Sequence, residues 1–118
     1  MHWIVCFDTA FLVALVRRDP KAEKRLEEYI AGEVTMSTTP ITACELFKGA
    51  YRSKKSENVA KVRQMLTHLE VLDFTVAACE AYGRLTNDLQ LKGTVIGDLD
   101  TMIASIALIH GEPLLTSD

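Results

Sequence analysis

Short apolar runs alternate along this chain with longer segments that have helical periodicity. Residues 3–7 form the first run, and its β-branched members are typical of a buried strand. Three further short strands are expected at residues 34–37, 70–74 and 113–115. Helices are expected at residues 8–17, 20–31, 39–51, 57–68, 75–91 and 97–110. This alternation predicts an α/β fold with three α/β/α layers, in which helices cover both faces of a parallel sheet.

The bulk composition fits one soluble domain. The chain has 118 residues, of which 48% are hydrophobic and 25% are charged, and this is enough to bury a core without disulfides. The sequence starts without a basic leader and long apolar region, and the apolar residues 10–16 are too few to span a bilayer. These features predict a single domain over residues 1–118, a cytoplasmic location and no membrane partner.

The three cysteines are odd in number, far apart in sequence and set in apolar surroundings. They are Cys6, Cys44 and Cys79. This pattern favours reduced thiols in the core of an intracellular protein over a disulfide framework or a metal-thiolate site.

Four acidic residues lie at the ends of predicted strands and helices: Asp8, Glu45, Asp100 and Asp118. In an open α/β sheet, ligands bind beyond the carboxyl ends of the strands. Carboxylates gathered there repel one another unless a cation holds them, and oxygen ligands suit Mg²⁺ or Mn²⁺. The four acids therefore predict a metal site and a phosphodiester-cleaving activity.

Each acid also has a structural explanation when it is taken alone. Asp8 and Asp98 can act as helix N-caps, and Asp100 in a first helical turn favours the helix dipole. Glu45 can be a surface residue of its helix, and Asp118 can be a tail residue. Spacing alone leaves both explanations open.

The net charge of −3 does not exclude a nucleic-acid partner. Asp98 and the four acids supply five negative charges, and removing these five leaves a balance of +2. A divalent ion would offset much of the acidic excess, so the global charge decides nothing about the partner.

Four segments resemble the motifs of PIN-domain ribonucleases, in the same order. They are Phe7-Asp8-Thr9-Ala10-Phe11-Leu12, the Glu-Leu segment of residues 41–49, the Gly-Asp-Leu-Asp segment of residues 96–107, and Leu115-Thr116-Ser117-Asp118. The resemblance is strongest to VapC-like toxins of prokaryotic toxin–antitoxin pairs, and it covers essentially the whole chain. It implies a PIN-like fold with a short central parallel sheet.

The resemblance also implies roles for individual residues. Asp8, Glu45, Asp100 and Asp118 match the catalytic acidic quartet that binds Mg²⁺ or Mn²⁺ in the family, and Thr9, Asp98 and Thr116 are expected to support it. The implied reaction is hydrolysis of RNA phosphodiester bonds by a metal-dependent endoribonuclease. The implied partners are the RNA substrate, a cognate antitoxin protein and a second copy of the chain in a homodimer.

The end of the sequence departs from the family pattern. Family members usually continue past the fourth acid with an aromatic residue and a last strand, whereas this sequence stops at Asp118. We therefore expect a chain that is truncated after the fourth acidic motif, or a short variant with a poorly held fourth ligand.

A basic stretch follows the segment that contains Glu45. Lys48, Arg52, Lys54 and Lys55 are its candidate RNA-binding residues, because clustered cations can follow a phosphate backbone. A solvated corner between two helices explains the same residues equally well. Contact with an acidic tail of a partner protein is a further possibility.

Two other functions keep an α/β fold. The first is a PIN-like scaffold that binds RNA or a protein without efficient cleavage. The second is a phosphoacceptor signalling domain, which also places an aspartate after its first strand. The second requires a phosphorylatable aspartate after the third strand and a lysine after the last, and the sequence disfavours it because Asp73 lies inside the predicted third strand.

Overall fold

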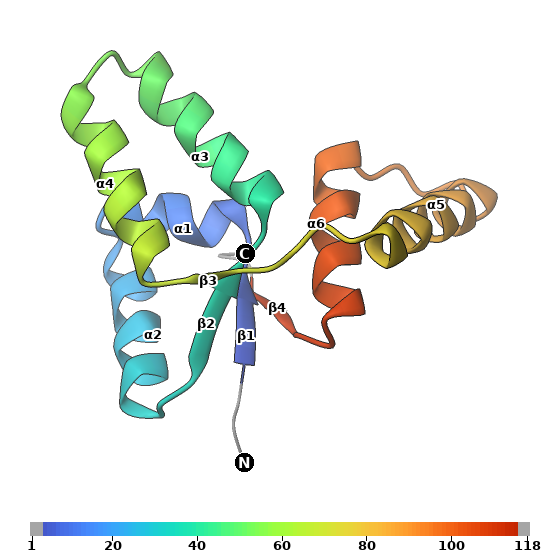
Figure 1. Cartoon of the computed structure of the whole chain (residues 1–118), viewed down its shortest axis with the longest axis horizontal. Helices are drawn as coiled ribbons and strands as arrows, with labels where there is room; N and C mark the ends of the chain where they lie inside the picture. The colour runs from blue at the N-terminus through green and yellow to red at the C-terminus, as the bar shows by residue number, and fades with distance from the viewer. Residues whose placement is uncertain (1–3, 116–118) are drawn as a thin grey trace.

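A computed structural model describes residues 4–115 of the chain, with side chains through residue 113. Within that range the chain forms four strands and six helices (Figure 1). Their order is β1 (Ile4–Phe7), α1 (Thr9–Val16), α2 (Pro20–Ala31), β2 (Thr35–Thr38), α3 (Pro40–Arg52), α4 (Ser56–Thr67), β3 (Glu70–Val71), α5 (Val76–Leu91), α6 (Asp98–Ile109) and β4 (Leu114–Leu115). Every predicted strand and helix is confirmed to within a few residues.

The four strands form one parallel sheet in the order β3-β2-β1-β4. β1 is central: Cys6 pairs with Ser37 of β2 on one side and with Leu114 of β4 on the other. The third strand is shorter than predicted. It ends at Val71, and after Leu72, whose N–H still donates to the Thr38 carbonyl at 2.9 Å, the chain leaves the sheet.

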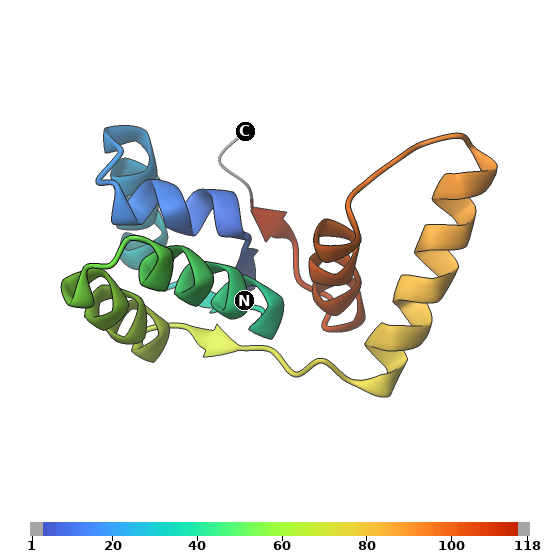
Figure 2. The ribbon, with the colours of Figure 1, turned by 90° about the horizontal axis from the view of Figure 1, so that it is seen from above.

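Alternating side chains of β1 divide the core into two layers. Val5 and Phe7 pack with buried residues of α1, α2, α3 and α4, whereas Cys6 packs with Ile106 of α6 and Ala78 of α5. Seen from above, the first four helices lie on one side of the sheet and α5 and α6 on the other (Figure 2). The expected three-layer α/β/α architecture is confirmed.

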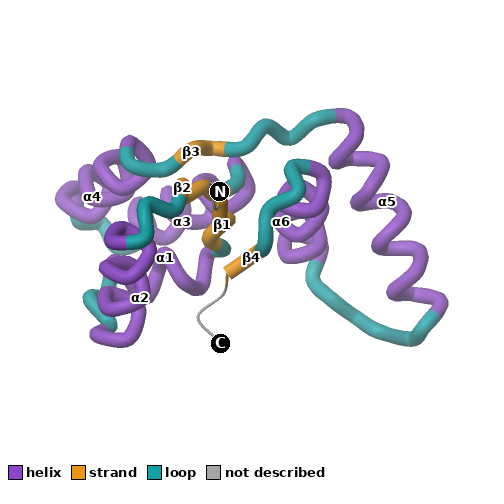
Figure 3. Tube along the Cα trace, turned by 90° about the horizontal axis from the view of Figure 1, so that it is seen from below, coloured by secondary structure: helices purple, strands orange, loops and turns teal. Residues whose placement is uncertain are grey.

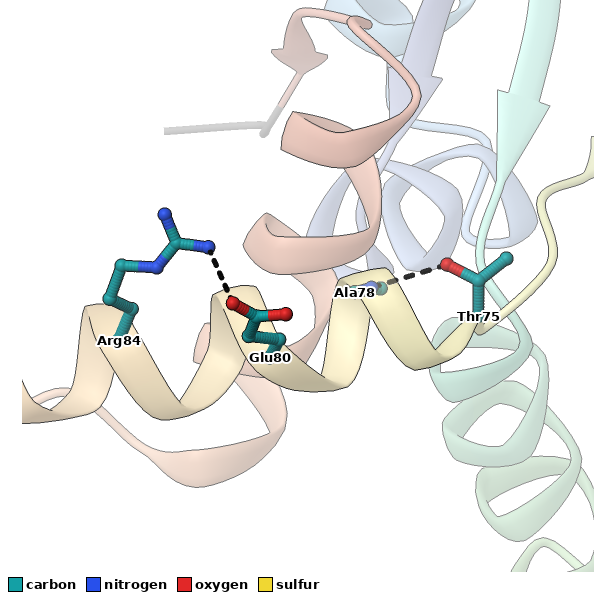
Figure 4. Close-up of polar contacts among 4 residues, drawn as sticks. All are labelled: Thr75, Ala78, Glu80 and Arg84. Atoms are coloured by element: carbon teal, nitrogen blue, oxygen red, sulfur yellow. Dashed lines mark hydrogen bonds and ion pairs between the residues drawn. The ribbon is translucent and has the colours of Figure 1, made fainter.

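Side-chain caps start several of the helices. The Asp8, Asp19, Thr39 and Thr75 side chains accept from backbone N–H groups at the starts of α1, α2, α3 and α5. Figure 4 shows the Thr75 cap on Ala78 (3.2 Å) and, one turn further along α5, an ion pair between Glu80 and Arg84 at 3.6 Å. That pair is well exposed, so it stabilises the helix only slightly.

The end of α2 lies where it is predicted. Gly32 is the C-cap of this helix, with φ −82°, and the next residue, Glu33, has the left-handed conformation, with φ 55°. Gly93, which follows Lys92, the C-cap of α5, has φ 70°.

The loop from α5 to α6 is exposed along its whole length. Every residue from 91 to 100 is exposed, and the loop spans the space between the ends of the two helices (Figure 3). Among the helices that the structure describes, none has the length and apolarity needed to cross a bilayer.

Candidate active site

The strand order places a crevice next to the central strand. In the order β3-β2-β1-β4, the direction of strand addition reverses between β1 and β4. Ligands of doubly wound sheets bind at such a reversal, beyond the carboxyl ends of the strands. β1 ends at Phe7 and Asp8 follows it directly, so Asp8 lies at this switch point.

Asp8 is held by both the strand and the helix that it joins. Its extended backbone, with ψ 178°, makes it the N-cap of α1, and its Oδ1 accepts from the Phe11 N–H at 3.0 Å. The Phe7 and Phe11 rings pack on either side of this junction, with centroids 4.6 Å apart. The capping role of Asp8 is confirmed, and the half-buried carboxylate has a defined position at the carboxyl end of the sheet.

Glu45 reaches the same region from α3. The Thr9 hydroxyl at the start of α1 donates to Glu45 Oε1, so Glu45 is tied to the residue that follows Asp8. The Thr9 and Thr42 hydroxyl oxygens lie 3.3 Å apart, and Thr39 Oγ1 lies 3.3 Å from Thr42 Oγ1. A chain of three threonine hydroxyls therefore supports the Glu45 carboxylate.

The supporting roles of Thr39 and Thr42 were not predicted. Both side chains are fully buried, and buried hydroxyls need hydrogen-bond partners. A sequence signal was present in the polar run Ser37-Thr38-Thr39, which interrupts the apolar character expected at the end of a buried strand. Thr38 uses its hydroxyl to reach the Phe7 carbonyl at 2.8 Å and so fastens the end of β1 to β2.

Asp98 and Asp100 both lie in the first turn of α6. The prediction that Asp98 is the N-cap is wrong: Gly97 occupies that position, and Asp98 accepts a hydrogen bond from the Tyr82 hydroxyl of α5 at 2.8 Å. This hydrogen bond to a carboxylate, together with burial, raises the pKa of Tyr82 above its usual value. Tyr82 thus connects α5 to the turn that carries Asp100, whose side chain is exposed.

The predicted acids are only partly brought together. Asp8 and Glu45 adjoin through Thr9, whereas Asp100 approaches from the helical layer on the other side of the sheet. Within residues 4–113, no three acidic, histidine or cysteine side chains are close enough to share a metal ion. The hydrogen bond from Thr9 keeps one oxygen of Glu45 turned toward α1. Thr116 and Asp118 lie outside the described residues.

The donor chemistry fits a hard divalent cation. Asp8, Glu45 and Asp100 offer only carboxylate oxygens, and Thr9 adds a hydroxyl; oxygen ligands are those that Mg²⁺ and Mn²⁺ prefer. β4 pairs Leu115 with Phe7, the residue that precedes Asp8.

Cys6 is a fully buried residue of β1, two positions before Asp8. Burial raises the pKa of its thiol to about 11; the negative charges of Glu112 and Asp8 act in the same direction, and a hydrogen bond with Ser37 opposes them. The prediction of three buried thiols holds for Cys6 alone, because Cys44 and Cys79 are exposed on their helices. All three are free, as expected.

A separate apolar groove of about 1100 Å³ opens between α1, α2 and α4. Its lining includes Leu12, Leu15, Leu26, Ile30, Met65 and Leu69. Ile30 is 58% exposed, which leaves a large apolar side chain at the rim. Apolar grooves of this size on soluble proteins commonly take up a ligand or a partner segment.

Comparison with known proteins places the chain in a family. The PIN domain model matches residues 5–118. The chain is 33% identical over 116 residues to Ribonuclease VapC2 of Rickettsia felis, covering 98% of this chain and 87% of that protein. It is 32% identical over 112 residues to the tRNA(fMet)-specific endonuclease VapC of Salmonella typhimurium, covering 94% and 83% of the two chains.

A solved structure agrees with these sequence relatives. The crystal structure of VapBC2 from Rickettsia felis bound to a DNA fragment from their promoter contains a chain that superposes with a TM-score of 0.88 at 32% identity. The match covers 98% of this chain and 87% of that one. The chain therefore belongs to the PIN-domain family, among the VapC ribonucleases.

Proposed function

We propose that this protein is a metal-dependent endoribonuclease that hydrolyses RNA phosphodiester bonds as the toxin of a toxin–antitoxin pair. The observation that carries the proposal is the placement of Asp8 and the Thr9–Glu45 pair at the switch point of the sheet, in a chain of the VapC family. This arrangement offers fixed carboxylates where a ligand of an α/β sheet binds.

Asp8, Glu45, Asp100 and Asp118 would hold Mg²⁺ or Mn²⁺, with Thr9, Asp98 and Thr116 in support. A bound ion of this kind supplies an activated water, a neutralised phosphoryl group and a stabilised leaving oxygen. The other contributions come from the chain itself. Thr9 orients the Glu45 carboxylate, which can then direct the attacking water and accept its proton. The hydrogen bond from the Phe11 N–H to Asp8 Oδ1 limits rotation of the Asp8 carboxylate.

The RNA would approach along α3. Lys48 and Arg52 follow Glu45 by three and seven residues, so they share its face of the helix, and both are exposed. Lys54 and Lys55 continue the row into the α3–α4 corner. Cations on this face can hold the phosphates on one side of the cleaved bond.

The activity is tested with purified protein and end-labelled RNA, in Mg²⁺ or Mn²⁺ and in chelator. Internal cuts that require the metal are expected. RNA binding without cutting, by a protein with a normal melting transition, would contradict the nuclease and favour the alternative of a PIN-like scaffold.

The apolar groove supports an antitoxin partner. A chain similar to this one occurs in the VapBC2 complex from Rickettsia felis. An amphipathic helix is the kind of segment that an apolar groove between helices takes up. We assign the groove between α1, α2 and α4 to a segment of the cognate antitoxin.

A second copy of the chain is the other proposed partner. The loop from α5 to α6 and the helix ends that flank it expose large apolar side chains: Val95 of the loop at 96%, Leu91 of α5 at 79% and Leu99 of α6 at 47% exposure. Clustered apolar exposure of this kind marks a protein interface. Light scattering should give the mass of a dimer, and a monomer at high concentration would contradict this assignment.

A further inference from the structure

We propose that the α3–α4 corner is a nucleotide subsite of the RNA substrate, separate from the cleavage site, in which a base stacks on Tyr51 and the adjacent phosphate is bound by Lys54, Lys55 and Arg63. The inference rests on the proposed ribonuclease function. A cavity of about 380 Å³ opens at this corner, between the end of α3 and the first turns of α4.

The cavity is lined by cations and by no acid. Lys54, Lys55 and Arg63 are three of its seven lining residues, and the remaining four are uncharged. All three cations are exposed, and the ion pairs that the described residues form, Arg18–Glu23 and Glu80–Arg84, involve none of them. The three positive charges are therefore available to an anionic ligand.

The rest of the lining suits a base. Tyr51 is 62% exposed at the cavity, and Ala50 and Val59 are buried beside it. An aromatic ring over an apolar floor is what an unpaired base stacks on, and single-stranded nucleic acids are bound by such rings combined with cations. An acidic peptide would use the cations but would have no need of the ring, so the lining favours a nucleotide.

The backbone of the corner is held in shape. The Ser53 hydroxyl donates to the Ala50 carbonyl at 2.6 Å and accepts from the Lys55 N–H at 3.2 Å and from Asn58 Nδ2 at 2.9 Å. Lys54 has φ 60°, a left-handed conformation that is costly for any residue other than glycine.

The distance from Glu45 to the corner suits an RNA strand that occupies both the cleavage site and the subsite. Tyr51 follows Glu45 by six residues, which along the axis of α3 is about 9 Å, and Lys54 lies two residues beyond the end of this helix. Lys48 and Arg52 lie on the same helix face as Glu45 and bridge this interval. A strand cut near Glu45 would thus place a nucleotide a few positions away into the cavity.

The test measures the binding of a labelled single-stranded RNA of about 12 nucleotides to the Asp100→Asn protein at several salt concentrations. Tyr51→Ala should weaken binding by about tenfold, whereas Tyr51→Phe should keep the affinity because it keeps the ring. Arg63→Glu should weaken binding and make the salt dependence shallower, by about 0.7 in the logarithmic slope for each lost phosphate contact. Arg25→Glu, on an exposed face of α2, is the matched control and should bind like the parent.

Two substitutions by glycine distinguish the effect of the Lys54 charge on RNA binding from an effect on protein stability. Lys54→Gly and Glu33→Gly both relieve a left-handed residue, so neither should lower the melting temperature. Only Lys54→Gly should weaken RNA binding.

The outcomes distinguish the subsite from the proposed nuclease. RNA affinities of Tyr51→Ala and Arg63→Glu equal to that of Arg25→Glu would overturn the subsite, and so would loss of antitoxin binding in place of RNA binding. Wild-type protein that binds RNA through these residues without cutting it would uphold the subsite and contradict the nuclease. Wild-type protein that does not bind RNA would overturn both.

Discussion

The hydroxyl group of Thr9, the first residue of α1, donates a hydrogen bond to the carboxylate of Glu45 in α3. The two residues are 36 positions apart in sequence, and Thr9 directly follows Asp8 at the end of the central strand. Thr9 therefore sets the relative position of two predicted metal ligands. Its backbone is joined to Asp8, and its hydroxyl holds the carboxylate of Glu45.

Replacing Thr9 by valine tests this positioning role. Valine has nearly the same shape but cannot donate, so Glu45 loses its orientation while α1 keeps its start. We expect RNA cleavage to fall by about 10- to 100-fold, as for other residues that orient metal ligands, and the metal concentration for half-maximal activity to rise. Thr9→Ser keeps the hydroxyl and should keep the activity. An unchanged metal requirement in Thr9→Val would contradict the role.

Asp100→Asn should abolish cleavage without unfolding the protein. The substitution is nearly isosteric and removes one charged ligand from an exposed position in the first turn of α6. We expect a loss of at least about 100-fold in kcat/KM and an unchanged circular dichroism spectrum. The matched control is Asp88→Asn, at an exposed site on α5. Asp98→Asn should have a smaller effect than Asp100→Asn, and the reverse order would refute the assignment of Asp100.

Divalent metal should raise the melting temperature near neutral pH. An ion that binds the native state far better than the unfolded chain stabilises it by about 2.7 kcal/mol at 100 times its dissociation constant. The rise should shrink in acid, because protons compete for the ligands, and in Asp8→Asn. Asparagine caps a helix as well as aspartate does, so this variant removes a charge but keeps the start of α1. Identical melting curves in metal and in chelator would argue against the site.

The Cys6 thiol should resist alkylation in the native protein. Cys6 has no exposed surface, and burial raises the pKa of its thiol to about 11, so it carries no thiolate near neutral pH. In chelator at pH 8, mass spectrometry should find Cys44 and Cys79 modified and Cys6 intact until denaturant is added. Since the unfolded thiol ionises near 9.0 and the folded thiol near 11, the contribution of Cys6 to stability should be lost as the pH rises between these values. Rapid labelling of native Cys6 would contradict its burial.

A substitution at the rim of the apolar groove should weaken antitoxin binding but leave RNA cleavage unchanged. Ile30→Glu places a charge at the groove rim, and the exposure of Ile30 lets the fold tolerate it. We expect weaker binding of the antitoxin measured by calorimetry, and RNA cleavage at the wild-type rate. Val76→Glu, at an 85% exposed site on α5 outside the groove, is the control. Equal antitoxin affinity in both variants would place the partner elsewhere.

Elements that depend on local signals were predicted well from the sequence. The strand at 4–7 has its β-branched apolar run, Thr39 and Thr75 cap helices where a hydroxyl precedes a helical pattern, and Asp8 does so after the first strand. These features depend on a few neighbouring residues, and the sequence displays all of them.

Features set by distant contacts were predicted poorly. Asp98 has every local property of an N-cap, yet its carboxylate is taken by Tyr82, 16 residues away. Cys44 and Cys79 lie among apolar neighbours in sequence, but the helix faces that carry them are exposed, because the core side of each helix is chosen by packing. The threonine network around Glu45 likewise joins α1 to α3, and no pattern within either helix reveals it.

The pairing of β1 with β4 also determines when the sheet can be completed during synthesis of the chain. Leu114 and Leu115 complete the edge of the strand that carries Cys6 and Phe7, more than one hundred residues earlier. Translation delivers the amino-terminal part first, so the central strand remains without this neighbour until residues 114 and 115 have emerged. A nascent chain therefore has the Thr9–Glu45 half of the centre but not the other wall of the crevice.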